Sequence, residues 1–327
     1  MNKHFPVFTV IGLVLTLLAI PLLFFLPQWV AALVALAGYF TAMKEFSKFT
    51  SGLQFFTQFL AAAVAGLALW YPFPGFSLIL LPFLLAAMST FGRITFFRFF
   101  GYTNHTWFEP LLFLLAIGTW LTQNLAFDSD WATWALPLPV FGFASIITWG
   151  IIKDKKQLLG VTAKGYRIAI GAEAPEFSLP DQNGKIVKLA DFKGQRHLLV
   201  IFVRGDWCPG CHMMLRTYQR EAERFKTKNI HVLSIGPDPA GVNKDMVERL
   251  GLDFSVLSDE GQKTAMIYGV QMQEYDNDFA EKYEEGIPLP ASFLIDKYGK
   301  VQYVSRPDRV GEFLNPSLIF PIIDKLN

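Results

Sequence analysis

Residues 198–212 read Leu198-Leu-Val-Ile-Phe-Val-Arg-Gly-Asp-Trp-Cys-Pro-Gly-Cys-His212. The first six form an apolar and partly β-branched run, which is typical of a strand buried inside a sheet. The segment from Cys211 to Lys226 is helix-like in its pattern. We therefore expect a strand that ends shortly before Trp207 and a helix that begins within the Cys-Pro-Gly-Cys sequence.

The two cysteines of this motif are placed for thiol chemistry. Cys208 lies at or next to the expected helix N-terminus, where the helix dipole and free N–H groups stabilise an anion and lower a thiol pKa. Cys211 lies one turn later on the same face, where it is able to attack a mixed disulfide formed at Cys208. Pro209 and Gly210 fit a tight first turn, in which a missing N–H costs nothing. We predict that Cys208 is the attacking thiol and Cys211 the resolving one.

The sequence around the motif alternates between two patterns from about Gly171 onward. Strand-like segments span 198–203, 230–235, 254–257, 292–295 and 301–304, and helix-like segments span 211–226, 243–250 and 261–268. The last two strands are joined by Asp296-Lys-Tyr-Gly-Lys300, which indicates a hairpin with glycine in its turn. This alternation predicts an α/β domain with a mainly parallel sheet that is covered on both faces.

The composition points to a chain with a large apolar part. Its 327 residues suggest about two domains. The chain is 52% hydrophobic and 17% charged, against about 25% charged residues in ordinary soluble domains. The formal net charge is +1, and nucleic-acid-binding proteins usually carry a marked excess of basic residues. No nucleic-acid partner is therefore expected. Two cysteines are too few for a disulfide scaffold, and because they lie within four residues of each other they form one local motif and not a link between distant segments.

The first 152 residues predict a multi-pass α-helical membrane domain. No Asp, Glu, Lys or Arg occurs from Phe5 to Met43 or from Gly52 to Phe91, and a bilayer core needs about 20 apolar residues per span. About six transmembrane helices are expected, near residues 6–26, 29–43, 53–71, 75–91, 108–126 and 131–152. A cleaved signal peptide is the alternative for the N-terminus, but further apolar runs follow it. A soluble helical bundle would show a polar face, which these runs lack.

Basic residues predict the orientation of this domain. They lie before the first expected span and after the second, fourth and sixth. These residues are Lys3, Lys44, Lys48, Arg93, Arg98, Lys153, Lys155 and Lys156. The other three connections contain no Lys or Arg, so the rule places both termini and the C-terminal domain in the cytoplasm. We expect a bacterial inner (cell) membrane. A periplasmic or extracellular C-terminal domain is the alternative.

These patterns divide the chain into a membrane domain of residues 1–152, a basic linker of residues 153–170 and an α/β domain of residues 171–327. The membrane domain contains no cysteine, so it lacks the thiols for a relay across the bilayer. No charged residue lies deep inside an expected span, and Arg93 and His105 are expected at the membrane surface. We expect the spans to act as an anchor in the lipid bilayer, or to hold a site that the sequence does not reveal.

Five segments of the α/β half form a characteristic set. They are Gly171-Ala-Glu-Ala-Pro-Glu-Phe-Ser-Leu-Pro-Asp-Gln-Asn-Gly184, Leu189-Ala-Asp-Phe-Lys-Gly194, Ser234-Ile-Gly-Pro-Asp238, Leu250-Gly-Leu-Asp-Phe254 with Leu257-Ser-Asp-Glu260, and Pro288-Leu-Pro-Ala-Ser-Phe-Leu-Ile-Asp296. Together they resemble the alkyl hydroperoxide reductase/thiol-specific antioxidant (AhpC/TSA) branch of the thioredoxin superfamily. The resemblance implies a thioredoxin fold, a redox-active disulfide and a cis-proline at Pro290 that presents backbone beside the active cysteine. Most membrane-tethered domains of this fold face outward, which conflicts with the orientation that the charges predict.

The resemblance leaves two activities open. Peroxiredoxins of the family carry a Pro-x-x-x-Thr-x-x-Cys site. Laid on this sequence, Arg204 takes the Pro place, Cys208 the Thr place and Cys211 the peroxidatic Cys place. The family's peroxide-stabilising Arg commonly precedes the Ser/Thr-Phe-Leu-Ile-Asp strand, where Pro290 stands instead. These departures favour a thiol–disulfide oxidoreductase, with a peroxiredoxin-type thiol peroxidase as the alternative.

Cys208-Pro-Gly-Cys-His212 also matches the c-type haem attachment pattern, in which His212 would ligate iron in an electron carrier. The strand before the motif and the segment at Pro290 oppose this remote alternative. A structural zinc site usually needs four ligands, and the sequence has no second Cys pair and no His pair. We expect neither a cofactor nor a metal.

The residues that flank the cysteines have modest expected roles. Trp207 is expected to pack beside the active site, and His212 to lie on the helix surface. Arg204 and Asp206 are expected in solvent, with some influence on thiol pKa values. The expected partners are the lipid bilayer, a protein or small-molecule disulfide or thiol substrate, and an external thiol reductant or oxidant.

Overall fold

The computed structural model describes residues 4–73, 75–96, 102–127, 129–162, 168–275, 281–305 and 316–326. The chain forms two compact units. The helical unit comprises Met1–Phe96 and His105–Asp154, and the α/β unit comprises Phe97–Asn104 and Lys155–Asn327. Each unit is described by itself below.

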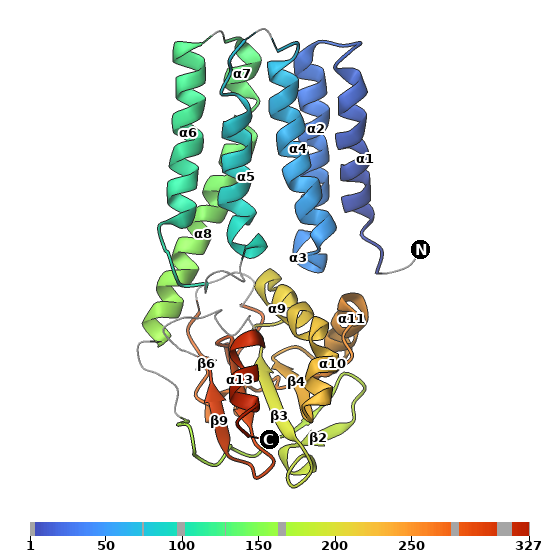
Figure 1. The fold of residues 1–327 in the computed structure, drawn as a ribbon, viewed down its shortest axis with the longest axis vertical. Helices are drawn as coiled ribbons and strands as arrows, with labels where there is room; N and C mark the ends of the chain where they lie inside the picture. Colours follow the sequence, from blue (N-terminus) through green and yellow to red (C-terminus); the bar gives the residue numbers. More distant parts are fainter. Residues whose placement is uncertain are drawn as a thin grey trace. The chain divides into compact units, whose positions relative to one another are not determined.

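The helical unit contains a helix for each of the six predicted spans (Figure 1). The helices that begin in this unit are α1 Val7–Leu22, α2 Gln28–Met43, α3 Phe46–Phe49, α4 Gly52–Trp70, α5 Leu80–Thr95, α6 Phe108–Ala126, α7 Trp131–Ala135 and α8 Leu138–Thr162. The sixth predicted span is divided, because a turn at Leu136 and Pro137 separates α7 from α8. α8 then continues to Thr162, so the predicted linker at 153–170 begins as helix and not as a connecting segment.

Small residues allow α1 and α2 to approach closely. A Cβ atom added to Gly12 would lie 2.6 Å from the Gly38 carbonyl oxygen, and one added to Gly38 would lie 2.5 Å from Thr16 Oγ1. Packing of this kind, through Gly, Ala and Thr, is how helices associate in lipid, where no hydrophobic force draws apolar helices together.

The two ends of the helical unit differ in chemistry. At one end, Lys44 Nζ lies 5.4 Å from the centroid of the Phe8 ring, and the Glu45 carboxylate accepts hydrogen bonds from the N–H and hydroxyl of Thr9. At the other end, ring contacts join Phe24 to Tyr71, Trp29 to Trp131 and Phe76 to Phe127. The first end therefore carries Lys44 and Glu45, and the other end is joined by contacts between aromatic rings.

Arg93 lies in the last turn of a helix and is shielded from solvent. It belongs to α5, its side chain is buried, and its guanidinium forms an ion pair with Glu109 of α6. Arg93 Nη2 also donates to the carbonyl oxygen of His105 at 2.8 Å. The carboxylate and the carbonyl replace the water that the buried guanidinium has lost.

Two of the described helical stretches are long and apolar enough to cross a membrane. They are Gly52–Trp70 and Trp131–Gly160, with mean hydropathies of 1.6 and 1.8. The helices Val7–Leu22, Gln28–Met43 and Leu80–Thr95 are apolar but shorter.

The α/β unit contains all the strands and helices that the sequence predicts for it. Its strands are β1 Ser178–Pro180, β2 Ile186–Lys188, β3 His197–Phe202, β4 Ile230–Gly236, β5 Ser255–Ser258, β6 Gln271–Met272, β7 Ile287–Pro288, β8 Ala291–Ile295 and β9 Val301–Val304. Its helices are α9 Pro209–Arg220, α10 Ala222–Thr227, α11 Ala240–Leu250, α12 Lys263–Ile267 and α13 Phe320–Ile323, with short 3-10 turns at Leu189–Asp191 and Pro316–Leu318. The predicted helix at 211–226 is divided at Glu221, and the β1–β2 hairpin is an addition to the prediction.

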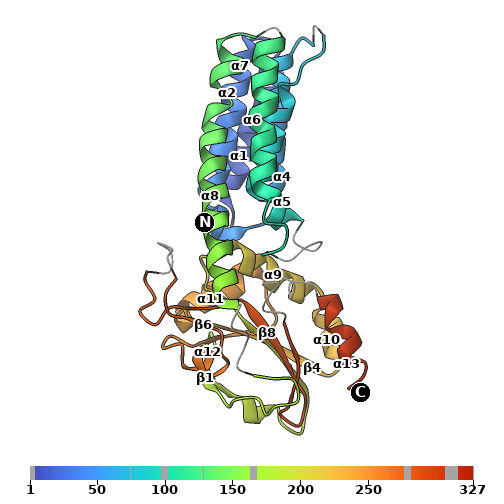
Figure 2. The same cartoon turned by 90° about the vertical axis from the view of Figure 1, so that its left-hand side faces the viewer.

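Five of the described strands form the central sheet in the order β5-β4-β3-β8-β9. Figure 2 labels two of them, β4 and β8. β3 and β5 run parallel to β4, whereas β8 runs antiparallel to both β3 and β9. The sheet is therefore mixed, and the prediction of a mainly parallel sheet is wrong for this half. The correctly predicted hairpin at 296–300 accounts for the antiparallel β8–β9 pair, because a short turn makes its two strands antiparallel. The β3–β8 pair, which joins distant parts of the chain, is antiparallel as well.

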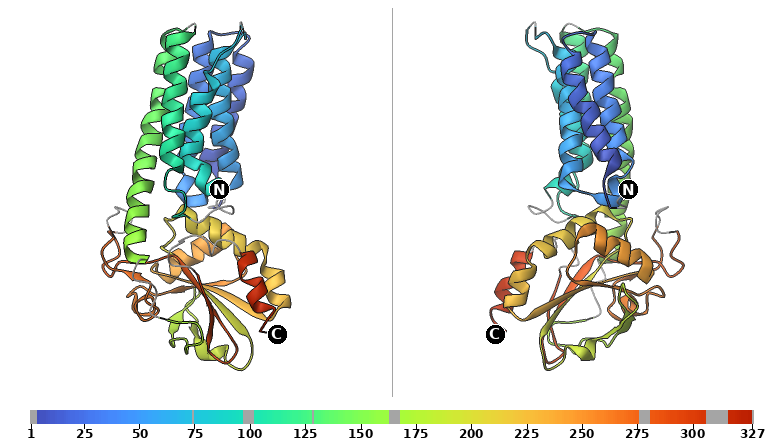
Figure 3. Two further views of the ribbon diagram at one scale, coloured as in Figure 1. Left: turned by 60° about the vertical axis from the view of Figure 1, so that its left-hand side comes forward. Right: turned by 90° about the vertical axis from the view of Figure 1, so that its right-hand side faces the viewer.

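The core of the α/β unit surrounds β3, in which six successive residues are buried. Neighbouring side chains of a strand point to opposite faces, so both faces of the sheet are covered. The rings of Phe202, Tyr268 and Phe293 contact one another in this core. At the C-terminal end of the chain, α13 lies beside α10, where the ring centroids of Phe320 and Phe225 are 4.9 Å apart (Figure 3).

We expect residues 155–327 to fold as a separate fragment, because the sheet and its aromatic core are made within this unit. Urea unfolding followed by circular dichroism should be cooperative. Phe293→Ala should lower the free energy of unfolding by about 3–5 kcal/mol, since it removes a buried ring. Tyr298→Ala is the matched control, because the Tyr298 side chain is 71% exposed. A fragment without a cooperative transition would mean that the α/β unit needs the helical unit in order to fold.

Candidate active site

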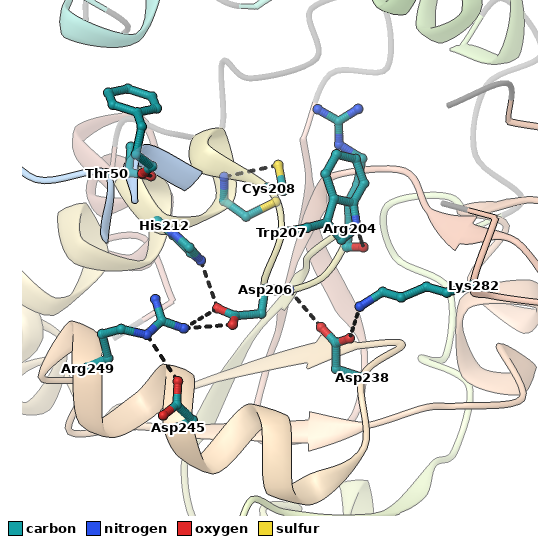
Figure 4. Close-up of polar contacts among 12 residues, drawn as sticks. Thr50, Arg204, Asp206, Trp207, Cys208, His212, Asp238, Asp245, Arg249 and Lys282 are labelled. Atoms are coloured by element: carbon teal, nitrogen blue, oxygen red, sulfur yellow. Dashed lines mark hydrogen bonds and ion pairs between the residues drawn. The ribbon is translucent and has the colours of Figure 1, made fainter. Parts of the chain in front are cut away.

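Cys208 is the N-cap residue of α9, immediately after the loop that leaves β3 (Figure 4). Its Sγ accepts a hydrogen bond from the Cys211 N–H at 3.4 Å. Pro209 occupies the first position of the helix, where its missing N–H would have had no partner, and Gly210 follows it in the first turn. The free N–H groups and the positive end of the helix dipole therefore act on Sγ. The predicted position of Cys208 at the helix start is confirmed.

The two thiols are free and buried, yet their pKa values move in opposite directions. A hydrogen bond from the Cys211 thiol, aided by the charge of Arg204, lowers the pKa of Cys208 to about 5 against the opposing effect of burial. Burial and the neighbouring Cys208 raise the pKa of Cys211 well above its usual value. At neutral pH the site therefore holds one thiolate, which is the nucleophilic form, beside one neutral thiol that donates to it.

Arg204 lies against two aromatic rings on one side of the motif. Its guanidinium carbon is 5.5 Å from the Trp207 ring and 5.7 Å from the Tyr275 ring. Arg204 Nη1 donates to the Tyr275 hydroxyl at 2.7 Å, and Trp207 Nε1 donates to the Arg204 carbonyl at 3.0 Å. Arg204 is 7% exposed, so the expectation that it is solvated is wrong. Its charge helps to lower the pKa of Cys208, and at Cys211 it only partly opposes the rise in pKa that burial causes. Trp207 packs beside the motif as predicted.

Asp206 and His212 form a close pair on another side of the motif. His212 Nε2 lies 2.9 Å from Asp206 Oδ1, and the His212 side chain is fully buried. Arg249 Nη2, on α11, donates to both carboxylate oxygens of Asp206 at 2.6 and 2.7 Å. Burial opposes ionisation, but His212 and Arg249 lower the pKa of Asp206 below its usual value. The expectation that His212 lies on a helix surface is therefore wrong. Asp206 is partly solvated, because its side chain is 22% exposed while His212 and Arg249 bind its carboxylate.

A second carboxylate, Asp238, fixes the loop between β3 and α9. It accepts hydrogen bonds from the Asp206 N–H at 2.7 Å and from the Tyr283 hydroxyl at 2.6 Å, and it pairs with Lys282 at 3.3 Å. Gly205 passes between these groups with a φ of 122°. A Cβ atom there would lie 2.5 Å from the Tyr283 hydroxyl oxygen, so a larger residue does not fit.

The sheet explains why these partners meet. β3 and β4 are parallel neighbours, so their carboxyl ends lie at one edge of the sheet, and Asp206 follows β3 while Asp238 follows β4. Polar residues after adjacent parallel strands are a signal that would have singled out both carboxylates from the sequence. Arg249 offers no such signal, because an Arg in the last turn of a helix is usually solvated.

Pro290 is buried directly before β8, but the Leu289–Pro290 peptide bond is trans. Within the described ranges, the cis bond that occurs is Tyr71–Pro72. The expectation of a cis-proline at Pro290 is therefore wrong. The backbone on both sides of Pro290 is held by the sheet region, because Leu289 N–H donates to the Val270 carbonyl at 2.6 Å and β8 begins at Ala291.

The site residues do not support the haem alternative. The His212 ring is buried against Asp206, on the inside of the α/β unit. In the part of the chain that the structure describes, no group of three or more His, Cys, Asp or Glu side chains is arranged to hold a metal ion.

Comparison with known proteins identifies similarity in the α/β half. Residues 170–304 match the AhpC/TSA family. The chain is 33% identical over 138 residues to peroxiredoxin Q, chloroplastic, of Oryza sativa subsp. japonica, which covers 42% of this chain and 59% of that protein. It is 34% identical over 143 residues to thiol-disulfide oxidoreductase ResA of Bacillus anthracis, which covers 43% of this chain and 72% of that protein.

Among solved structures, peroxidoxin BcpB from Mycobacterium tuberculosis aligns with 49% of this chain and 99% of its own, with a TM-score of 0.44 and 19% identity. The chain thus spans less than two thirds of the peroxiredoxin Q relative and nearly three quarters of the ResA relative.

We expect the reduced full-length protein to show a thiolate titration with a midpoint near pH 5. The thiolate absorbs in the ultraviolet, and its signal should be present above this pH and lost below it. The difference spectrum between wild type and Cys208→Ser isolates this thiol. Cys211→Ser keeps a hydroxyl donor and should shift the midpoint less than Cys211→Ala, which keeps none. A midpoint above about pH 8, the range of a free thiol, would contradict the site as described.

Proposed function

The chain belongs to the AhpC/TSA family, and from this membership and the site we propose that it is a membrane-anchored thiol–disulfide oxidoreductase. The observation that carries the proposal is Cys208 at the N-cap of α9, with Cys211 one turn later as donor to its Sγ. The family includes proteins with either of the two activities named for the relatives above. The argument for disulfide exchange therefore rests on this chain's own residues.

The proposed reaction uses the two thiols in turn. The Cys208 thiolate attacks one sulfur of a substrate disulfide, which forms a mixed disulfide and releases the other sulfur as a thiolate. Cys211 then loses its proton and attacks Cys208, which closes the Cys208–Cys211 disulfide and releases the second substrate thiol. The substrate disulfide gains two electrons and the dithiol loses two. An external thiol reductant returns the pair to the dithiol, and an external oxidant would drive the sequence in reverse.

The surroundings favour exchange over peroxide reduction. When the Pro-x-x-x-Thr-x-x-Cys pattern is laid on this sequence, Cys211 takes the peroxidatic place. Burial and Cys208 raise the pKa of Cys211, so it is protonated when a peroxidase would need a thiolate. The place of the peroxide-binding hydroxyl is taken by Cys208. Loss of one preorganised donor typically costs about 2.7–4 kcal/mol of transition-state stabilisation. Peroxide reduction remains the second candidate, because peroxiredoxin Q is among the similar proteins.

The helical unit supports the membrane part of the proposal. Large apolar side chains face outward on its surface, with exposed fractions of 82% for Phe25, 76% for Leu125 and 70% for Trp149. Large apolar side chains that face outward fit a lipid environment, where they need no contact with water. We assign six spans, and we assign the end that carries Lys44 and Lys48 to the cytoplasm of a bacterial inner membrane.

Trapping distinguishes the two thiols. In membranes supplied with disulfide substrate, Cys211→Ser should accumulate mixed disulfides on non-reducing gels after an acid quench, because nothing resolves them. Cys208→Ser should accumulate none, and the double variant is the control. Wild type should also react with a small disulfide faster than with hydrogen peroxide in stopped-flow measurements.

The opposite pattern would change the assignment. If Cys208→Ser alone traps substrate, the roles of the two thiols are reversed. If peroxide oxidises the protein far faster than the disulfide does, and Cys211→Ser abolishes this, the protein is a peroxiredoxin.

Protease treatment of vesicles tests the anchor and its orientation. The protein should remain in the membrane pellet after alkaline carbonate washing, since the apolar spans hold it in lipid. Protease should remove the C-terminal α/β unit in inside-out vesicles and leave it intact in right-side-out vesicles. Cleavage only in right-side-out vesicles would place the unit outside the cytoplasm. Release by carbonate would refute membrane integration.

A further inference from the structure

We propose that Tyr275 is a positioning residue for the redox pair, because its hydroxyl holds the Arg204 guanidinium beside Trp207, and that the cation fixed there makes the Cys208/Cys211 couple more oxidising. Tyr275 acts on the reaction through Arg204. The inference rests on the proposed use of Cys208 as the attacking thiol, and it adds to that function a residue that controls its reduction potential.

The geometry begins with the side chain of Arg204. Its Nη1 donates to the Tyr275 hydroxyl at 2.7 Å, and its guanidinium carbon lies 5.5 Å from the Trp207 ring and 5.7 Å from the Tyr275 ring. Figure 4 shows the Arg204 side chain beside the Trp207 ring. Arg204 is also largely buried. Two rings and one hydroxyl thus restrict a side chain that has several rotatable bonds when it is exposed.

The loop between β3 and α9 brings Arg204 to the redox pair. Trp207 Nε1 donates to the Arg204 carbonyl at 3.0 Å, and the Cys208 N–H donates to the Gly205 carbonyl at 3.2 Å. These bonds fold residues 204–208 into a tight turn directly before α9. The backbone N–H of Arg204 also acts as a hydrogen-bond donor to the Cys211 sulfur. Arg204 therefore lies next to the dithiol.

Tyr275 lies three residues after β6, in a segment with a fixed base. β6 pairs with β7, and a Cβ atom added to Gly286 would lie 2.0 Å from the Met272 carbonyl oxygen, so the two backbones meet closely. The same segment brings the Tyr283 hydroxyl to Asp238 at 2.6 Å. The segment from β6 to β7 thus holds the loop before α9 at two points, one of which is the Arg204 side chain.

The kind of partner that Arg204 has here matters for the thiolate. A tyrosine hydroxyl is neutral at pH 7, so the hydrogen bond from Arg204 fixes the guanidinium without cancelling its charge. The guanidinium itself is always protonated in proteins. The hydrogen bond from Cys211 has the largest effect on the pKa of Cys208, and the charge of Arg204 lowers this pKa further.

Other titratable and charged groups also face the dithiol and Arg204. The carboxylate of Asp206 is paired with Arg249, and that of Asp238 is paired with Lys282, so both have cationic partners of their own. The full set comprises Asp206, His212, Asp238, Arg249, Lys282 and Tyr283. The experiment below leaves all of these groups in place.

The redox consequence follows from which state carries the negative charge. Reduction of the disulfide by two electrons and one proton at neutral pH gives the Cys208 thiolate and the Cys211 thiol. A cation held near Cys208 stabilises this thiolate and has no anion to stabilise in the disulfide. The reduction potential is therefore higher when Arg204 is held in place.

The experiment measures the equilibrium of full-length protein, in detergent, with glutathione buffers of known ratio at neutral pH. Arg204→Gln should make the disulfide about tenfold harder to reduce, which corresponds to a potential about 30 mV lower. Tyr275→Phe keeps the ring and removes the hydroxyl, and it should make reduction about threefold harder, or about 15 mV lower in potential. Both variants should raise the pH midpoint of the Cys208 thiolate titration.

Tyr298→Phe is the matched control. Tyr298 is exposed and also has a cation near its ring, since Lys297 Nζ lies 5.4 Å from the ring centroid. The same loss of a hydroxyl at this position should change neither the potential nor the titration midpoint.

The double variant tests whether Tyr275 acts through Arg204. If it does, Tyr275→Phe should lower the potential of wild type and have no further effect in the Arg204→Gln background, because two residues that act as a unit are not additive. An unchanged potential in Tyr275→Phe alone would overturn the proposal. An equal loss in both backgrounds would overturn it as well.

The outcomes also separate the two levels of the account. A wild-type pair that forms no disulfide in any buffer refutes the proposed function. A normal disulfide whose potential is unchanged by Tyr275→Phe refutes only the role of Tyr275.

Discussion

The hydrogen bond from the Cys211 N–H to Cys208 Sγ is the contact on which the active site depends. It exists because Cys208 caps α9, and the cap exists because β3 ends at a fixed place in the sheet. β3 is buried on both faces, so its end cannot shift without exposing apolar side chains to water. Pro209 then starts the helix at one position. The burial of β3 thus fixes the position of the Cys208 thiolate.

The loop between β3 and α9 is held by polar contacts of its own residues and by the backbone conformation of Gly205. Gly205 takes a backbone conformation that other residues rarely adopt, and Asp238 accepts the Asp206 N–H beside it. Arg204 lies against aromatic rings on one side, and Arg249 reaches Asp206 from α11. These buried charges are compensated by partners, which is the condition for keeping them in a folded protein. These contacts connect the Cys-Pro-Gly-Cys motif to α11 and to the loop after β4.

The sequence predicts the local elements of this protein well and the surroundings of its site poorly. The strands and helices of the α/β unit, the hairpin at 296–300 and the cap at Cys208 follow from short-range pattern and turn chemistry. The burial of Arg204 and His212 and the ion pair of Asp206 do not, because the partners of this site include Arg249 and Tyr275, more than 40 residues away in the chain. The resemblance predicts a cis bond before Pro290, whereas the Leu289–Pro290 bond is trans.

The most direct test of the central claim is which sulfur reacts first. Reduced full-length protein is exposed briefly to a maleimide at about pH 6, where an ordinary thiol is almost wholly protonated. The modified cysteine is then located by peptide mass spectrometry. The account predicts modification of Cys208, because its thiolate persists at this pH, with Cys211 unmodified. Preferential modification of Cys211 would contradict the account.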